Sequence, residues 1–266
     1  HSFNVGIDFN LFKNRLNGTI EFFNKKTTDM LFYKDFPLSS GYGTSVQLPV
    51  NIGDLYNRGI EISLEGVAVR TNDVDLSFNA NLTHYKNKIT RLDEAYREEG
   101  IKYSSSILKE GGSVYQTYML KFAGIDPETG AATYYKEDAD GNITTTTDAT
   151  SATKFDCGTT MPKVYGGFGA SLRVKDFDLT AQFSYQLGGK IYDGSYQSLM
   201  CSDNSTGKGN NIHRDLLKAW TPENTNTDVP LWKDNMWGGL AQTSCDYFLT
   251  SSNYLSINNV NLGYNL

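Results

Sequence analysis

The amino-acid sequence predicts an all-β fold that forms part of a large antiparallel transmembrane β-barrel. Three observations lead to this prediction. Apolar and polar residues alternate in segments of about ten residues. Short turns and long polar connections follow one another strictly along the chain. The composition is rich in aromatic residues (13%) and in glycine (25 residues), yet the mean hydropathy is only -0.44, and no run of 18 apolar residues offers a transmembrane helix.

The first hairpin occupies the beginning of the chain. Residues Phe3 to Leu11 place apolar side chains at every second position, and residues Leu16 to Phe23 do the same. Only the stretch Phe12 to Arg15 separates these two segments. Such a tight connection predicts an antiparallel hairpin.

Two further hairpins follow the same plan. In one, Ile60 to Glu65 and Leu76 to Thr83 alternate on either side of a turn at Thr71–Asp73. In the other, alternating segments from Val164 and from Phe177 flank a turn at Lys175–Asp176. A seventh strand is expected to begin at Tyr254, so the sequence predicts seven strands of one sheet.

The connections between the hairpins are long and polar: residues 24–58, 86–163 and 188–253 are rich in Gly, Ser, Asn, Asp and Thr. Structureless connections of this length argue against a compact soluble domain. In outer-membrane barrels, in contrast, short periplasmic turns and long extracellular loops are the rule. Eleven residues that rise about 3.4 Å each at a tilt of about 45° climb roughly 26 Å, which matches the apolar band of such a barrel.

The alternation also assigns the two faces of the sheet. The side chains expected to face lipid are Ile60, Ile62, Leu64, Leu76, Phe78, Leu179 and Phe183. Those expected to face the lumen are Glu61, Glu65, Ser77, Asn79, Thr180 and Gln182. A soluble β-sandwich, such as a surface adhesin or glycan-binding domain, would alternate in the same way. The polar face favours the barrel, because it carries mostly uncharged residues and few lysines.

Some local structure is expected inside the connections. Apolar residues at helical spacing predict short surface helices in residues 89–99 and 212–220. A small hairpin is expected between Thr133–Lys136 and Ile143–Thr145. Of the three cysteines, Cys201 and Cys245 would pair in an oxidising compartment, and the alternative is that Cys157, Cys201 and Cys245 are all unlinked thiols.

Charge and motifs narrow the function. The net charge of -6 disfavours nucleic acid as a partner. The three histidines, His1, His84 and His213, stand in no metal-ligand or triad spacing, and the sequence contains no nucleophile elbow, HExxH or P-loop motif. We therefore expect no enzyme, no catalytic or metal-binding residues and no cofactor. A barrel enzyme, such as an outer-membrane lipase or protease, is the alternative from another class.

Many blocks of the chain resemble one family in its order. The segment NVGIDFNLFKNRLNGTIEFFNKKTTDMLF at residues 4–32, the segment PLSSGY at 37–42 and NIGDLYNRGIEISL at 51–64 resemble the C-terminal barrel of SusC-like (SusC/RagA) TonB-dependent transporters of the Bacteroidetes outer membrane. Further matching blocks lie at residues 81–90, 110–135, 161–172, 220–230 and 252–266. The resemblance thus spans nearly the whole chain.

The resemblance implies a barrel of about 22 strands, the size class whose lumen is plugged. Residues 1–266 would then be a partial barrel domain, its late strands and long extracellular loops, without the signal peptide, the plug and the final strands of the family. The implied function is TonB-dependent uptake of oligosaccharides (glycans) or peptides across the outer membrane. The implied partners are a SusD-like surface lipoprotein, the TonB complex, which contacts the absent N-terminal part, and membrane lipid.

The long loops are the natural place for contacts with a substrate or with the lipoprotein. Their aromatic side chains pack well on sugar rings and on protein surfaces. The candidate contact residues are Tyr192, Tyr196, Trp220, Trp232 and Trp237. Aromatic residues also fill loop interiors and membrane girdles, so the spatial position of each ring has to decide between these roles.

Overall fold

A computed structural model describes residues 1–35, 41, 47–200, 211–232, 240 and 243–266. Its main element is one antiparallel sheet of seven strands in the order β1-β2-β3-β4-β12-β13-β16. The strands are β1 (Ser2–Leu11), β2 (Leu16–Asp35), β3 (Gln47–Arg70), β4 (Val74–Leu92), β12 (Val164–Val174), β13 (Phe177–Leu187) and β16 (Tyr254–Tyr264). The seven predicted strands are therefore confirmed, and they belong to one sheet.

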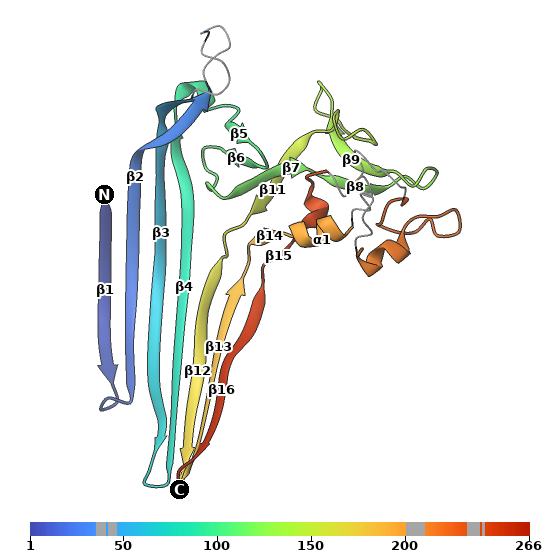
Figure 1. Cartoon of the computed structure of the whole chain (residues 1–266). Coiled ribbons are helices and arrows are strands. Elements are labelled where there is room, and N and C mark those ends of the chain that lie inside the picture. The colour runs from blue at the N-terminus through green and yellow to red at the C-terminus, as the bar shows by residue number, and fades with distance from the viewer. Residues whose placement is uncertain (36–40, 42–46, 201–210, 233–239, 241–242) are drawn as a thin grey trace.

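The hairpin turns of the sheet gather at one end, and the long connections gather at the other (Figure 1). The predicted turns at Phe12–Arg15, Thr71–Asp73 and Lys175–Asp176 are all confirmed. In the first of them, Phe12, Lys13 and Asn14 all adopt positive φ angles of 57° to 67°. This left-handed backbone reverses the chain within four residues and matches the twist of the flanking strands.

The register places the predicted apolar residues on one face of the sheet. One row across the sheet, from β3 to β16, consists of residues that pair side by side: Leu64, Ala80, Phe168, Phe183 and Ile257. The neighbouring row on the other face runs through Glu65, Asn79, Gly169, Gln182 and Asn259. The sheet therefore has one apolar and one polar face, as the alternation predicts.

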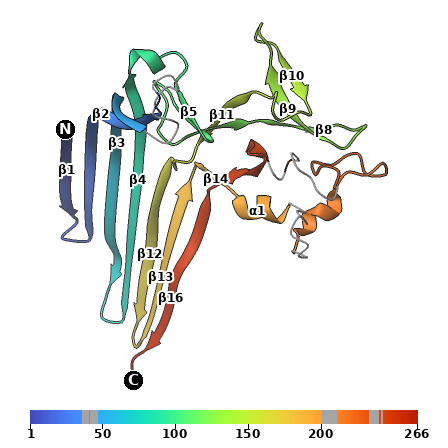
Figure 2. The same cartoon turned by 45° about the horizontal axis from the view of Figure 1, so that its top comes forward.

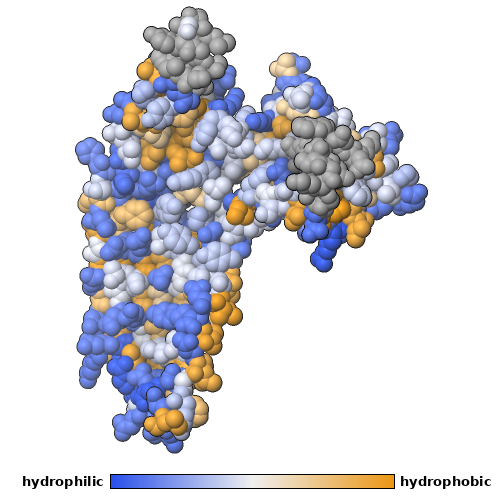
Figure 3. Space-filling view, viewed as in Figure 1, coloured by the Kyte–Doolittle hydropathy of each residue, from blue (hydrophilic) through white to orange (hydrophobic). Residues whose placement is uncertain are grey.

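The apolar face is exposed over the lower part of the sheet. Phe78 is 48% exposed, Ile257 65% and Leu262 76%. The clusters of buried residues lie in the outer part of the molecule, and one of them includes Ile52, Ile89 and Leu92 from the outer ends of β3 and β4. In the space-filling view, hydrophobic side chains line the lower right margin of the sheet, on the side of β16 (Figure 3). A soluble sandwich would cover such a face with a second sheet. Among the described residues no second sheet does so.

The prediction that residues 24–58 form a long loop is wrong. Strand β2 has 20 residues and extends to Asp35, and β3 has 24 residues and begins at Gln47. The ladder between them continues because backbone hydrogen bonds need no apolar face. The apolar alternation is interrupted at residues 24–29 and 53–59, next to register shifts in the ladder, and apolar residues return beyond the interruption at Met30–Tyr33 and at Leu48, Val50 and Ile52. Alternation alone therefore ends the strands too early.

The predicted helix at residues 89–99 is also wrong in most of its length. Ile89 and Leu92 belong to β4, and only the 3-10 helix η2 (Glu94–Tyr96) follows. The register shifts so that Thr90 is an extra residue in β4, a β-bulge. The bulge brings Ile89 and Leu92, three residues apart, to the same face, where both are fully buried. A spacing that resembles a helical turn thus comes from a bulged strand.

The long connection after β4 folds into two small sheets above the main sheet (Figures 1 and 2). One has the order β11-β7-β6-β5, and the other has the order β10-β9-β8. Their strands are β5 (Ile101–Tyr103), β6 (Ser106–Leu108), β7 (Gln116–Leu120), β8 (Phe122–Ile125), β9 (Ala132–Glu137), β10 (Ile143–Thr146) and β11 (Lys154–Thr159). The predicted hairpin between Thr133–Lys136 and Ile143–Thr145 is confirmed as β9 and β10.

The connection after β13 contains short elements. They are β14 (Lys190–Tyr192), α1 (Gly194–Leu199), the 3-10 helices η3 (Arg214–Lys218) and η5 (Asp246–Phe248), and β15 (Leu249–Ser251). The predicted helix at residues 212–220 is thus a single 3-10 segment, with Leu216 buried inside it. The helices in the described part of the chain are too short and too polar to cross a membrane.

Two cysteines can be placed. Cys157 and Cys245 are buried free thiols. Burial raises the pKa of the Cys245 thiol to about 12, which keeps it protonated and unreactive at neutral pH. Cys201, the other half of the bridge considered above, lies outside the described residues.

Candidate functional site

The most pronounced opening in the sheet lies where β4 and β12 part. Their pairing runs from Val74↔Val174 up to Thr83↔Tyr165 and stops there. Strand β4 continues upward to Leu92, whereas β12 begins at Val164 and the chain before it turns away. The outer half of β4 therefore does not pair with β12, and the two strands diverge there (Figure 1). The backbone of Ile89 instead bonds Gly111 and Gly112 of the loop before β7. We call the region between the outer half of β4 and the start of β12 the notch.

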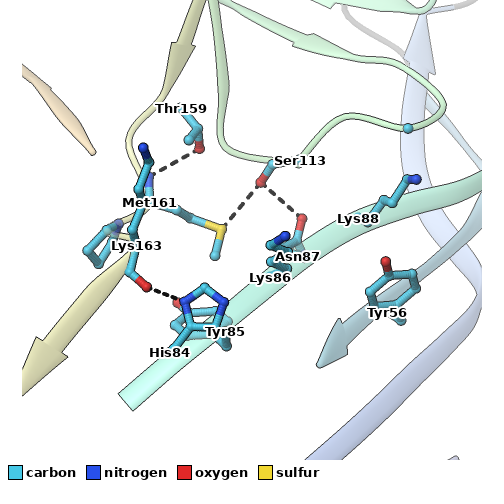
Figure 4. A pocket seen from close by; sticks show the side chains of 12 residues that line it. Tyr56, His84, Tyr85, Lys86, Asn87, Lys88, Ser113, Thr159, Met161 and Lys163 are labelled. Atoms are coloured by element: carbon cyan, nitrogen blue, oxygen red, sulfur yellow. Dashed lines mark hydrogen bonds between the residues drawn. The ribbon is translucent and has the colours of Figure 1, made fainter. Parts of the chain in front are cut away.

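A cavity of about 430 Å³ occupies this notch (Figure 4). Three segments line it: the outer part of β4, the loop before β7, and the link between β11 and β12. The lining residues are Tyr56, His84, Tyr85, Lys86, Asn87, Lys88, Gly111, Ser113, Thr159, Met161, Pro162 and Lys163. Its volume is in the range of small-ligand sites.

Hydrogen bonds hold the walls of the notch together. The Oδ1 atom of Asn87 accepts from Ser113 Oγ at 3.1 Å and from the backbone N–H of Val114 at 2.9 Å. The Nδ2 group of Asn87 donates to Asn57 Oδ1 at 2.9 Å. Across the notch, His84 Nδ1 lies 2.5 Å from the carbonyl oxygen of Lys163. A carbonyl only accepts, so this ring nitrogen carries the proton.

The charge around the cavity is of one sign. Lys86, Lys88 and Lys163 line it and are exposed, and no carboxylate is among the lining residues. The cavity is therefore suited to an anion. In the described part of the chain, no group of His, Cys, Asp and Glu side chains is arranged to hold a metal ion.

A second cluster of functional interest is aromatic and lies in the outer loops. Tyr196 stacks on Tyr247 with the ring centroids 6.4 Å apart, and it meets His213 edge-on at 4.8 Å. Its hydroxyl donates to Asp215 at 3.2 Å. Tyr192 packs against Phe248 at 6.0 Å. The two tyrosines singled out from the sequence thus stand together, half-buried, and burial raises the pKa of both.

The tryptophans have different surroundings. Trp220 is buried, with its ring against Gly130, and its Nε1–H has no hydrogen-bond partner among the described residues. Trp232 is 49% exposed beside Pro230 and Leu231 at the rim of a small apolar cleft. Trp237 lies outside the described residues. Of the candidate tryptophans that can be placed, Trp232 is the one whose ring is available to a partner.

The family of the chain follows from its first 150 residues. They match the family described as TonB dependent receptor-like, beta-barrel. The chain belongs to this family. The match begins at the first strand of the sheet and ends after β10, so it covers more than half of the chain. The all-β barrel fold is thereby confirmed.

Curated relatives of the receptor barrel agree over the whole chain. TonB-dependent receptor P3 of Formosa agariphila is 28% identical over 98% of the chain, and TonB-dependent receptor P26 of the same organism is 26% identical over all of it. TonB-dependent receptor SusC of Bacteroides thetaiotaomicron is 24% identical over 99%. The chain spans about a quarter of the length of these relatives.

Solved structures show the same fold. A structure of the RagAB peptide transporter is 28% identical, with a TM-score of 0.77, and covers 99% of this chain and 28% of its own. The RagAB peptide importer in its closed-closed state gives a TM-score of 0.78. The predicted resemblance to SusC-like transporters and the outer-membrane location are therefore confirmed. The exposed apolar face of the receptor barrel is its lipid face.

Sequence reasoning missed the cavity in the notch. Its signal was present, because the apolar strand Leu76–Leu82 is followed by Lys86 and Lys88 at alternate positions. Both lysines fall in residues 86–163, however, which the sequence predicts to be a long connection. The link between β11 and β12 comes from a segment some 75 residues later, and no local pattern indicates that it returns to this edge of β4.

Proposed function

We propose that the chain is a segment of a TonB-dependent importer, supplying part of the barrel wall and of the outer loops, and that it is not an enzyme. Seven strands whose first and last members are not paired with each other cannot close a lumen. A membrane tolerates only a closed barrel, so the remaining strands would come from other parts of the same protein. The plug and the segment that contacts the TonB complex would lie there too.

The observation that carries this proposal is the sheet itself. It combines an exposed apolar face, a polar face of Asn, Ser, Thr, Gln and Gly, and loops on one end only. This combination suits a wall between lipid and an aqueous lumen that opens to the cell surface. The likeness to the RagAB peptide transporter supports import as the activity.

We infer that the imported nutrient is an oligosaccharide or a peptide, taken up together with a SusD-like surface lipoprotein. Relatives named SusC and RagAB support these classes. The outer loops offer a contact surface: Trp232 is half exposed, and the cleft that it borders is also lined by Tyr247 and Phe248, the rings on which Tyr196 packs. Aromatic anchors of this kind dominate protein interfaces and stack on sugar rings.

The test is carried out on the intact protein in its native outer membrane. Trp232→Ala is compared with Ile143→Ala, which also removes an exposed apolar side chain from an outer loop but lies on the β9–β10 hairpin. We expect both variants to retain the folded barrel. Trp232→Ala should reduce co-purification of the lipoprotein and uptake of labelled oligosaccharide or peptide, whereas Ile143→Ala should leave both unchanged.

Two readouts separate the parts of the proposal. Uptake measured with an oligosaccharide pool and with a peptide pool decides the substrate class. Uptake that persists when TonB is deleted would contradict the importer mechanism. Equal lipoprotein capture and equal uptake by both variants would show that Trp232 is no contact residue.

A further inference from the structure

Cationic side chains gather on the lipid-side face of the sheet, directly above its apolar band. The register aligns Asn24, Arg58 and Lys86 in one row and Lys26, Tyr56 and Lys88 in the next. These rows continue the apolar face upward, because Ile60 and Leu82 precede them at alternate positions on the same strands. The face thus changes from apolar to cationic within a few residues.

The height of these rows corresponds to lipid headgroups. Lys86 and Lys88 lie four and six residues beyond Leu82 on β4. The row of Phe22, Ile60 and His84 lies above Leu82, so at about 3.4 Å per residue and a tilt of about 45° the two lysines stand roughly 5 and 10 Å above the last apolar row of this face. The hydrocarbon core of a bilayer is about 30 Å thick and about 40–45 Å with its headgroups, so long lysine side chains at these heights reach the headgroup layer.

These cations are available to an external anion. The ion pairs found among the described residues do not include Arg58, Lys86 or Lys88. All three are exposed, and the guanidinium of Arg58 lies over the ring of Tyr56, 4.8 Å from its centroid. Lys26 is less free, since its charge helps to lower the pKa of Asp54.

The notch between β4 and β12 adds depth to this surface. Lys86 and Lys88 line its cavity together with Tyr56 and His84 from the lipid-side face, and Lys163 closes it from the other wall (Figure 4). The hydroxyl protons of Ser113 and Thr159 are already donated, to Asn87 Oδ1 and to the carbonyl oxygen of Tyr115. Lys163 stands at a polar-face position, two residues before Tyr165, so an anion on the lipid-side face would meet Lys86 and Lys88. Its attached acyl chains could run down the apolar face below.

We propose that Arg58, Lys86 and Lys88 form a binding site for the phosphorylated headgroup of an anionic membrane lipid in the outer leaflet. The phosphate sits in the cationic cavity, and the acyl chains lie along Ile60 and Leu82. Charge complementarity and continuity with the apolar band identify a lipid as the occupant. The proposal rests on the outer-membrane location and is independent of which nutrient is imported.

The experiment measures lipid retention by the intact protein. The purified protein is placed in nanodiscs of dioleoylphosphatidylcholine with 10 mol% dioleoylphosphatidic acid as the phosphate-bearing probe, a chosen composition, and bound lipid is counted by native mass spectrometry. We expect selective retention of phosphatidic acid over phosphatidylcholine. The triple variant Arg58→Gln, Lys86→Gln, Lys88→Gln should weaken this retention by at least about tenfold, because it removes the three cations that attract the phosphate.

A matched variant removes the same charge elsewhere. Lys109→Gln, Lys121→Gln, Lys136→Gln changes three lysines of the outer loops, two of them exposed and Lys136 half-buried, and should retain the lipid as the unmodified protein does. Inorganic phosphate at millimolar concentration should not displace the lipid, and if it did, the site would be one for free anions. Unselective retention, or equal retention by both triple variants in correctly folded barrels, would overturn the proposal.

Discussion

The rings of Phe168 and Phe183 lie stacked across the ladder between β12 and β13, with their centroids 4.9 Å apart and their planes inclined by 14°. Both rings stand on the apolar face, and both remain accessible from outside. The stack is therefore lateral: the aromatic side chains support one another within the sheet and leave their outer surface to the lipid.

The two faces of β4 should respond in opposite ways to a positive charge. Phe78 lies on the apolar face at 48% exposure, and Asn79 lies on the polar face. Near mid-membrane, an arginine on the lipid face costs about 2–4 kcal/mol. We therefore expect Phe78→Arg to impair barrel assembly and Asn79→Arg to be tolerated, as measured by the heat-resistant band of the intact protein on a gel. Equal assembly of the two variants would contradict the assignment of Phe78 to the lipid face and Asn79 to the lumen face.

The turn at Asn14 and the β9–β10 hairpin should lie on opposite sides of the membrane. They stand at opposite ends of the sheet (Figure 1). In intact cells, a membrane-impermeant maleimide should label Asp140→Cys and should not label Asn14→Cys. The parent protein carries Cys201→Ser, since Cys157 and Cys245 are buried. Labelling of Asn14→Cys without labelling of Asp140→Cys would invert the topology.

The outer ends of β3 and β4 should loosen in acid. Asp54 accepts hydrogen bonds from Arg91 at 3.1 and 3.2 Å and from the backbone N–H of Asp29, and these bonds lower its pKa. A lowered pKa means that the stabilisation is complete above the ordinary aspartate value of 3.8 and is lost as the pH falls through the lowered value. The effect is modest, because the Arg91 side chain is 53% exposed.

Asp54→Asn should accordingly increase hydrogen exchange in the outer part of β3 at pH 7, and the difference from the unmodified protein should disappear in strong acid. Glu98→Gln, a change at an exposed carboxylate outside the ion pairs found, serves as the control. A difference that grows as the pH falls would show that the Asp54–Arg91 pair does not stabilise this region.

Replacing Gly130, which lies between β8 and β9 in the outer loops, should destabilise this region. It has a φ of +70°, and a Cβ placed there would lie 2.5 Å from the ring of Trp220. The left-handed backbone alone costs an alanine about 1–2 kcal/mol, and the collision adds to this. Gly130→Ala should speed hydrogen exchange in β9 without affecting the barrel. Gly194→Ala, where a Cβ meets open space, should change neither, and unchanged exchange in Gly130→Ala would contradict the packing against Trp220.

The transmembrane part of the fold could be predicted from the sequence because lipid imposes a strict alternation. The starts of β12 at Val164 and of β13 at Phe177 are predicted to the residue. Outside the lipid band this constraint disappears. Strand β3 continues for about ten residues outside the segment that the alternation predicts, and there the buried cluster of Ile52, Ile89 and Leu92 is assembled from distant segments.

The site residues were harder to predict for the same reason. Tyr192 and Tyr196 were correctly placed in one loop region, but their mutual arrangement depends on Tyr247 and Phe248, some 50 residues later in the chain. Trp220 and Trp232 are chemically alike, yet one is buried against Gly130 and the other is half exposed. Burial of a single ring is a property of tertiary packing, which local sequence does not encode.

The unequal lengths of the strands give the protein two kinds of slow amide proton. Strand β3 has 24 residues, whereas β12 and β13, on the far side of the notch, have 11 each. In the lower half of β3 an amide is protected because water and hydroxide do not enter the bilayer. In the upper half it is protected only by the ladder to β2 and β4. The two halves of β3 thus have slow amide exchange for different reasons: exclusion of water in the lower half and hydrogen bonding in the upper half. Only the exchange in the upper half should become faster when denaturant is added to the surrounding water.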